Sequence, residues 1–127
     1  MPRKPIIAID GPAGAGKTTA ARNLAEKLGL IYLDTGATFR AVALKAIRVG
    51  VSLDDEPSLL SLAEGCDIVF AGDRLERILL DGEDVSRAIR EPSVALASSR
   101  VAVHPGVRAH LVRLWRSLGA KGGVIWG

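Results

Sequence analysis

Residues 6–18 read IIAIDGPAGAGKT, and this stretch decides the fold class. The apolar run 6–9 is short and continuous, which is typical of a strand that is buried on both faces of a parallel sheet. The segment after it fits the phosphate-binding pattern G-x-x-x-x-G-K-[ST]. Its members are Gly11, Pro12, Ala13, Gly14, Ala15, Gly16, Lys17 and Thr18. The sequence therefore predicts a phosphate-binding loop between a central parallel strand and a helix.

The residue types of this loop suit a nucleotide phosphate. Glycines let successive backbone N–H groups point at phosphate oxygens, and the N-terminus of the following helix adds positive potential. Lys17 can reach the β- and γ-phosphates, and the hydroxyl of Thr18 can ligate the Mg²⁺ that bridges them. A plain glycine-rich turn is the alternative, but a buried strand before the motif and an amphipathic helix after it are both predicted.

The residues that follow predict a helix, a short strand and a second helix. Apolar side chains recur at helical spacing over 18–28, and Gly29 is typical of the position just after a helix. The buried face of this helix is expected to hold Ala21, Leu24, Ala25 and Leu28. Residues 31–33 read as an extended segment, and 36–49 as a helix that Gly50 ends. The side chains expected to face inward from this second helix are Ala43, Leu44 and Ile47.

The middle of the chain predicts a third helix and then a set of short strands. Asp54 or Asp55 can cap a short helix with Pro57 in its first turn. Its apolar side is Leu59, Leu60, Leu62 and Ala63. The runs 68–70 and 78–80 then read as short strands separated by glycine-containing turns, with Asp81-Gly82 as a hairpin signal. We therefore expect a small antiparallel β insert at about 66–91.

The last third predicts helical character again after Pro92, with a helix that Pro105 opens and Gly119 closes. Its apolar face is Val107, Leu111, Leu114, Trp115 and Leu118. An apolar strand is expected at 123–126, with Trp126 in the core together with Trp115. Strands that alternate with helices predict an α/β fold with a parallel sheet.

Composition limits the remaining classes of protein. The chain has 127 residues, of which 48% are hydrophobic and 24% charged, and this composition excludes a disordered chain and permits one compact domain. One cysteine, Cys66, excludes an internal disulfide and indicates a reducing compartment, so we expect a cytoplasmic protein. The apolar run near the start is too short for a signal peptide, and no membrane span is predicted. The formal charge of +3 and an aromatic content of 4% do not indicate a nucleic-acid surface.

A second group of polar residues opens the helix after residues 31–33. Asp34, Thr35, Gly36 and Arg40 surround a helix start, where free backbone N–H groups can meet an anion. The guanidinium of Arg40 suits a phosphate monoester, whereas Asp34 or Thr35 can simply cap the helix and leave Arg40 in solvent. Spacing alone leaves both interpretations open.

The remaining polar residues read as structural. Ser98, Ser99, Arg100 and Arg108 are more simply a solvated helical face. His104 and His110 are six residues apart, which is not a metal-binding spacing on a helix, so both are expected to be surface or cap residues. No metal cage is predicted.

Three segments together resemble a known family. These are 7–18 (IAIDGPAGAGKT), 32–44 (YLDTGATFRAVAL) and 80–86 (LDGEDVS), and they resemble bacterial cytidylate kinases. The resemblance runs from about residue 5 to residue 125. It implies a phosphate-loop nucleoside monophosphate kinase fold that transfers the γ-phosphoryl group of ATP to CMP or dCMP with Mg²⁺.

The resemblance also implies roles for single residues. The loop 11–18 would hold ATP, Lys17 would stabilise the transferring group, and Thr18 would ligate the metal. Asp34, Thr35 and Gly36 would line the acceptor site, and Arg40 would hold the CMP phosphate. Ser99 and Arg108 fall where the family contacts the cytosine ring. This implication reverses the structural interpretation that spacing gives for these two residues.

The sequence departs from the family pattern in two places. Phe39 stands where the family usually has tyrosine, so a hydroxyl is lost while ring packing is kept. After 124–125 the family continues with an acidic-Gly-Arg-Asp motif and an arginine-bearing lid. We therefore expect residues 1–127 to be a single, incomplete kinase domain. We also expect a monomer. The alternatives are a nucleotide-binding fragment without catalysis and a kinase for another small acceptor.

Overall fold

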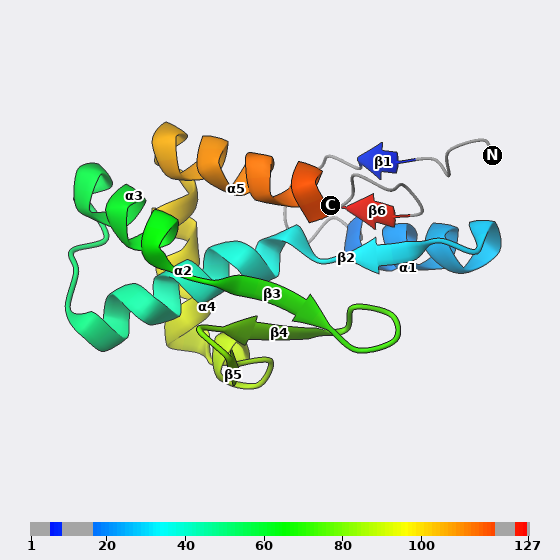
Figure 1. Ribbon diagram of the computed structural model, residues 1–127, viewed down its shortest axis with the longest axis horizontal. Helices are drawn as coiled ribbons and strands as arrows, with labels where there is room; N and C mark the ends of the chain where they lie inside the picture. The colour runs from blue at the N-terminus through cyan, green and yellow to red at the C-terminus, as the bar shows by residue number, and fades with distance from the viewer. Residues whose placement is uncertain (1–5, 9–16, 119–123, 127) are drawn as a thin grey trace.

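Three short parallel strands form the sheet that carries the fold (Figure 1). The computed structural model describes residues 6–8, 17–118 and 124–126, with side chains from residue 23 to residue 118. The strands are β1 (Ile6–Ala8), β2 (Ile31–Leu33) and β6 (Val124–Trp126), and they lie in the order β1-β6-β2. Among the described strands β6 is therefore central, and the prediction that 6–9 is the central strand is wrong.

The strand order follows from the width of the connection between β1 and β2. Helix α1 (Lys17–Leu28) connects them, and a helix of about 10 Å diameter is about as wide as two strand spacings. A gap of one strand is thus left between β1 and β2, and β6 fills it. Ala8 and Leu33 both pair with Trp126, so the three strands end at the same edge of the sheet.

The first two helices begin and end close to where the sequence predicts. Helix α1 ends at Gly29, whose φ is +65°, and the N–H of Leu30 donates to the carbonyl of Ala25 at 2.8 Å. Helix α2 (Thr35–Val49) ends at Gly50, whose φ is +79°. Both glycines adopt the left-handed conformation that avoids a Cβ clash, which confirms their predicted role.

Two apolar side chains of these helices that the sequence predicts to be buried are exposed. Leu28 and Ile47 are about half exposed, although both were expected to face inward. Each belongs to the last turn of its helix, and residues 47–50 are all exposed. Helical spacing predicts which face a residue shares but not how far the neighbouring elements cover that face.

A cluster of helices around α2 contains most of the core. Helices α3 (Glu56–Gly65), α4 (Pro92–Ala102) and α5 (Pro105–Leu118) pack against α2, and α3 also packs against α5 (Figure 1). A short 3-10 turn, η1 (Ala88–Arg90), precedes α4. Leu59, Leu111 and Trp115 are buried as predicted. Trp126 was also expected in the core, but its side chain lies outside the described residues.

The predicted antiparallel unit is present. Strands β3 (Ile68–Ala71), β4 (Arg77–Leu80) and β5 (Glu83–Asp84) form a sheet in that order. Asp81 and Gly82 join β4 to β5 with φ angles of +51° and +86°, as in a two-residue turn with both central residues left-handed. The predicted Asp-Gly hairpin turn is thus confirmed.

Two ion pairs attach this hairpin to α2. The Lys45 Nζ atom lies 2.7 Å from Asp81 Oδ2, and Arg48 forms two hydrogen bonds to the Glu83 carboxylate, at 2.9 and 3.1 Å. A bidentate pair fixes orientation as well as distance. The same helix therefore touches the sheet edge through its first residues and the hairpin through its last two turns.

None of the helices within the described ranges has the length and apolar content needed to cross a membrane.

Candidate functional site

The first turn of α2 brings Asp34 and Arg40 together at the end of β2. Asp34 is the capping residue, and its Oδ1 accepts a hydrogen bond from the N–H of Ala37 at 3.2 Å. Its other oxygen, Oδ2, lies 3.2 Å from Nη2 of Arg40. Both side chains are about one-third exposed, so a solute can reach them. Asp34 therefore caps the helix, as one of the two interpretations expects, but Arg40 is paired with Asp34 instead of being left in solvent, and its binding of a phosphate remains a prediction.

Gly36 leaves the space in which this pair forms. A Cβ atom at Gly36 would lie 3.3 Å from Asp34 Oδ1 and 3.4 Å from Arg40 Nη1, which is closer than ordinary van der Waals contact. Any side chain here would push the two groups outward. The absence of a side chain at Gly36 thus allows Asp34 and Arg40 to pair.

The two threonines of this turn are buried instead of facing solvent. Thr35 is 6% exposed and Thr38 is fully buried. The Thr38 hydroxyl donates to the carbonyl of Thr35 at 2.6 Å and accepts from the indole N–H of Trp115 at 2.9 Å. These bonds tie the first turn of α2 to α5. The predicted place of the Thr35 hydroxyl beside an acceptor nucleotide remains a prediction.

Arg108 also lies at this turn. Its guanidinium carbon is 5.2 Å from the centre of the Phe39 ring, and that ring meets Trp115 edge-on at 5.7 Å and 71°. A cation above an aromatic face is attracted by the negative charge of the ring. Phe39 immediately precedes Arg40, so α5 delivers Arg108 to the segment that carries Arg40.

The other predicted residues are less closely connected. Ser99 is exposed on α4, and within residues 23–118 its side chain has no hydrogen bond or ion pair. Lys17 and Thr18 are the first two residues of α1, and nothing is described of their side chains. Residues 11–16 of the predicted phosphate loop lie outside the described residues.

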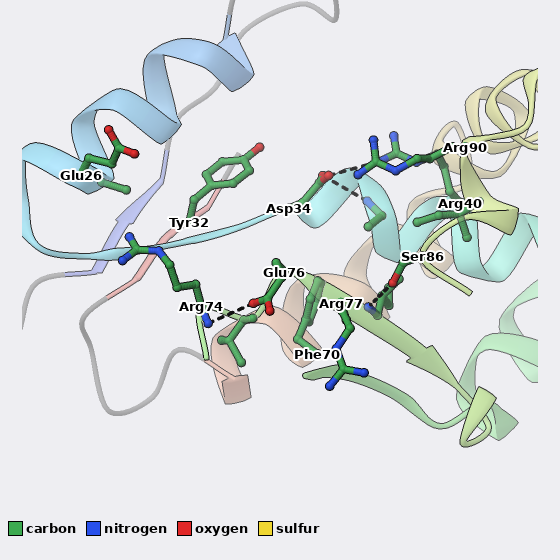
Figure 2. Close-up of a pocket in the computed structure, with 15 residues that line it drawn as sticks. Glu26, Tyr32, Asp34, Arg40, Phe70, Arg74, Glu76, Arg77, Ser86 and Arg90 are labelled. Carbon is green, nitrogen blue, oxygen red and sulfur yellow. Dashed lines mark hydrogen bonds and ion pairs between the residues drawn. The ribbon is translucent and has the colours of Figure 1, made fainter. Parts of the chain in front are cut away.

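A cavity of about 320 Å³ opens beside Asp34 and Arg40, between α1, β2, α2 and the β3–β4 loop (Figure 2). Four of its lining residues are arginines, namely Arg40, Arg74, Arg77 and Arg90. Three are acids, namely Glu26, Asp34 and Glu76. The arginines favour an anion, while the carboxylates compete for the same groups.

Sequence reasoning missed three of these arginines. Arg74 donates weakly to the carbonyl of Leu30 at 3.4 Å, and Arg77 lies 3.7 Å from Asp84. Arg74 lies in the β3–β4 loop, Arg77 begins β4, and Arg90 ends the 3-10 turn. The one sequence signal was the run of charged residues in 73–77. Which way these side chains point depends on how the antiparallel sheet packs against the rest of the described chain.

The side chains of residues 23–118 offer no metal centre of their own. No three His, Cys, Asp or Glu side chains in that range are grouped to hold an ion. His104, expected to be a surface or cap residue, directly precedes α5 and its carbonyl accepts from the N–H of Arg108, while its side chain is mostly buried, with Nε2 2.8 Å from the carbonyl oxygen of Leu53. Burial raises the pKa of the Cys66 thiol, which keeps it protonated and unreactive near neutral pH.

The two strands that precede the two sequence motifs end at the same edge of the sheet. The chain leaves β1 at Ala8 and β2 at Leu33, and both residues pair with Trp126. In open α/β sheets, ligands bind beyond the carboxyl ends of the strands. The phosphate-loop motif after β1 and the Asp34–Arg40 turn after β2 therefore start from the same edge.

The chain is similar in sequence to known cytidylate kinases. A cytidylate kinase of Syntrophotalea carbinolica is 50% identical over 126 residues, covering 98% of this chain and 54% of the relative. A cytidylate kinase of Pelotomaculum thermopropionicum is 54% identical over 123 residues, covering 95% and 54%. A bifunctional pantoate ligase/cytidylate kinase of a Synechococcus species is 47% identical over 128 residues, covering 98% and 24%. The chain spans about half the length of the curated cytidylate kinases it matches.

The sequence model of the cytidylate kinase family matches residues 7–127, which is nearly the whole chain. The match includes both motifs at the sheet edge and the hairpin segment that the ion pairs attach to α2. The chain belongs to the cytidylate kinase family.

Proposed function

We propose that the protein to which this chain belongs transfers the γ-phosphoryl group of ATP to CMP or dCMP, giving ADP and CDP or dCDP. The observation that carries the proposal is the shared sheet edge. A donor-phosphate motif follows one strand, an arginine suited to a phosphate monoester follows another, and both strands end level with Trp126. Two phosphate sites at one edge are what a transfer between two phosphates requires.

On the donor side, the proposal assigns the loop 11–18 to ATP. Lys17 is the first residue of α1, and the backbone at a helix N-terminus favours anions. Lys17 would balance the charge that moves onto the leaving β-phosphate as the bond to the γ-phosphorus breaks.

On the acceptor side, Arg40 would hold the phosphate of CMP. Asp34 keeps its guanidinium at the start of α2, and partial exposure leaves donors free to turn toward a ligand. Arg108 and Ser99 would contact the base, and the position of Arg108 above Phe39 supports the first of these roles. Asp34, Thr35 and Gly36 would line the same acceptor site.

The chemistry then consists mainly of positioning. An oxygen of the CMP phosphate attacks the γ-phosphorus in line with the leaving oxygen of ADP, so one P–O bond forms as another breaks. No covalent enzyme intermediate is needed. The cations at both ends hold two anions that otherwise repel each other.

Residues of this chain suit Mg²⁺ only in part. Thr18 lies in the first turn of α1, and a hydroxyl oxygen is an acceptable Mg²⁺ ligand, whereas the described side chains supply no carboxylate cluster for it. When bound with ATP, Mg²⁺ would neutralise phosphate charge, with Thr18 as the ligand from this chain.

The test is ADP production by the 127-residue chain with ATP and Mg²⁺, using CMP, dCMP, UMP, AMP or no acceptor. Turnover confined to the cytidine nucleotides supports the proposal. Turnover with a different acceptor contradicts the assigned specificity. Binding of ATP and CMP without turnover indicates that catalysis needs segments of the longer relatives, as the coverage of about half their length suggests.

A further inference from the structure

His104 joins three helices at one point. Its N–H donates to the carbonyl of Val101 at the end of α4, and its carbonyl accepts from the N–H of Arg108 in the first turn of α5. Its side chain reaches in a third direction, to the segment before α3. There Nε2 lies 2.8 Å from the carbonyl oxygen of Leu53. A carbonyl oxygen only accepts hydrogen bonds, so Nε2 is the donor.

The same junction has two further bonds. The N–H of Gly106, in the first turn of α5, donates to Glu56 Oε2 at 3.1 Å, and His104 Nδ1 lies 3.8 Å from that oxygen. Arg100 on α4 pairs with Asp54 at 2.7 Å. Both ends of the α4–α5 turn are therefore attached to residues 53–56.

The His104 side chain is the buried member of this group. It is 15% exposed, whereas the side chains of Arg100 and Asp54 are 55% and 75% exposed. Hydrogen bonds shielded from water hold geometry more firmly than exposed ion pairs, which contribute little. His104 and Glu56 thus add polar attachments to the first turn of α5, beside the fully buried side chain of Val107.

Arg108 depends on that turn for its place. Its N–H is bonded directly to the carbonyl of His104 at 3.0 Å, and its guanidinium lies over Phe39, next to Arg40 in the chain. A small rotation of the start of α5 would be magnified along the long Arg108 side chain and would move the guanidinium off the ring.

We propose that His104 is a positioning residue that, through its bond to Leu53, holds Arg108 over Phe39 and so presents Arg108 to the acceptor nucleotide. The second half of this statement rests on the proposed function. The first half concerns the chain alone and is measured without nucleotide.

The experiment uses isotope-labelled 127-residue chain and NMR. Nuclear Overhauser contacts between Arg108 side-chain protons and the Phe39 ring report the stacked position. His104→Phe keeps a ring but removes the donor to Leu53, and Glu56→Ala removes the acceptor for Gly106. His104→Gln keeps an N–H donor at a similar distance and should rescue. His110→Phe is the matched control, because His110 lies on α5, the helix that His104 precedes, and within residues 23–118 its side chain has no hydrogen bond or ion pair.

The expected result is that the contacts weaken in His104→Phe and Glu56→Ala but persist in His104→Gln and His110→Phe. CMP affinity, measured by calorimetry well below the unfolding temperature, should fall about tenfold in the two disrupting variants, as for a lost hydrogen bond to a charged group. ATP affinity should not change. A merely structural role of His104 would instead weaken the binding of ATP and of CMP together.

Two results overturn the proposal. One is unchanged Arg108–Phe39 contacts in both disrupting variants, and the other is an equal loss of ATP and CMP affinity. If the contacts respond as expected but the wild-type chain binds no CMP, the positioning of Arg108 by His104 stands and the proposed function is the part that fails.

Discussion

The guanidinium of Arg108 and the ring of Phe39 form a stacked pair, with 5.2 Å between the guanidinium carbon and the ring centre. The pair joins α5 to the first half of α2, and Phe39 is itself held edge-on by Trp115. A residue that spacing alone assigns to a solvated face is thereby fixed beside the predicted acceptor site. The contact with the Phe39 ring is the physical reason why Arg108 lies there.

Replacing Phe39 with leucine should release Arg108. Leucine keeps an apolar side chain in this buried position but offers no aromatic face, and a cation–π contact contributes roughly 0.5–1 kcal/mol at an exposed site. We expect CMP affinity to fall about two- to fivefold, by calorimetry, with ATP affinity unchanged. A variant that binds CMP as tightly as the wild type would show that the stack is irrelevant to the acceptor.

Arg40→Ala should weaken the binding of CMP far more than that of ATP. Hydrogen bonds to charged groups contribute about 1.5–3 kcal/mol, so CMP affinity should fall roughly 10- to 150-fold. Arg40→Lys should restore only part of it, because an ammonium group cannot form the paired contacts of a guanidinium. Arg113→Ala, an exposed arginine on α5, serves as control, and equal effects at the two positions would contradict the assignment.

Lys17→Ala should remove transfer while the chain stays folded. Loss of one group that stabilises transition-state charge lowers kcat by about 10²–10³-fold in comparable sites. ADP production is the measurement, and ATP affinity by calorimetry is the second readout. Lys27→Ala is the matched control, since Lys27 is exposed in the last turn of the same helix. Unchanged turnover in Lys17→Ala would disprove the role.

The hydrogen bond between Trp115 and Thr38 should matter for stability. Thr38→Val keeps the shape but leaves the buried indole N–H without its acceptor, which costs about 1–3 kcal/mol of unfolding free energy. Urea denaturation measures the loss. In Thr38→Val/Trp115→Phe both partners are gone, so the double variant should be less destabilised than the two single losses added together. Simple additivity would show that the bond contributes nothing.

Acid should weaken the attachment of the hairpin to α2. The N–H of Asp67 and the Lys45 ammonium favour the charged carboxylate, and they hold the pKa of Asp81 below its ordinary value near 3.8. A lowered pKa in the folded chain means that this stabilisation is complete above the ordinary value and is lost as pH falls through the lowered one.

Asp81→Asn tests this pH dependence. Asparagine tolerates the left-handed turn conformation and keeps an oxygen acceptor for Asp67, but it carries no charge. Wild type should be the more stable chain at pH 7, by urea denaturation, and the difference should shrink below about pH 3.8. Asp73→Asn, in the exposed β3–β4 loop, should show no such trend. A difference that is constant with pH would contradict the assignment.

Local signals predicted most of the fold. Gly29 and Gly50 end their helices, Asp55 caps α3, and Asp81-Gly82 turns the hairpin, because each depends on backbone conformation within a few residues. The order of the strands was not predictable in this way. It depends on which strand fills the gap beneath a crossover helix, and that is a property of distant segments.

The candidate site likewise contains residues that local sequence signals predict and residues that they do not. Asp34 and Arg40 were predictable because both belong to one helix start that also carries a family motif. The cavity arginines Arg74, Arg77 and Arg90 were not, since they come from the β3–β4 loop, the start of β4 and a 3-10 turn, whose places depend on how the antiparallel sheet packs. The bond of His104 to Leu53 spans 51 residues and has no local signal.

The place of β6 between β1 and β2 has a consequence for the order of folding. Residue 6 pairs with residue 124, so the sheet requires closure of nearly the whole chain, and long closures are slow. The main buried cluster, in contrast, draws its members from residues 33–115. During synthesis this cluster is complete while β6 is still absent, and β1 and β2 have no strand between them. The sheet edge from which the nucleotide motifs start therefore assembles after this cluster, when β6 pairs with β1 and β2.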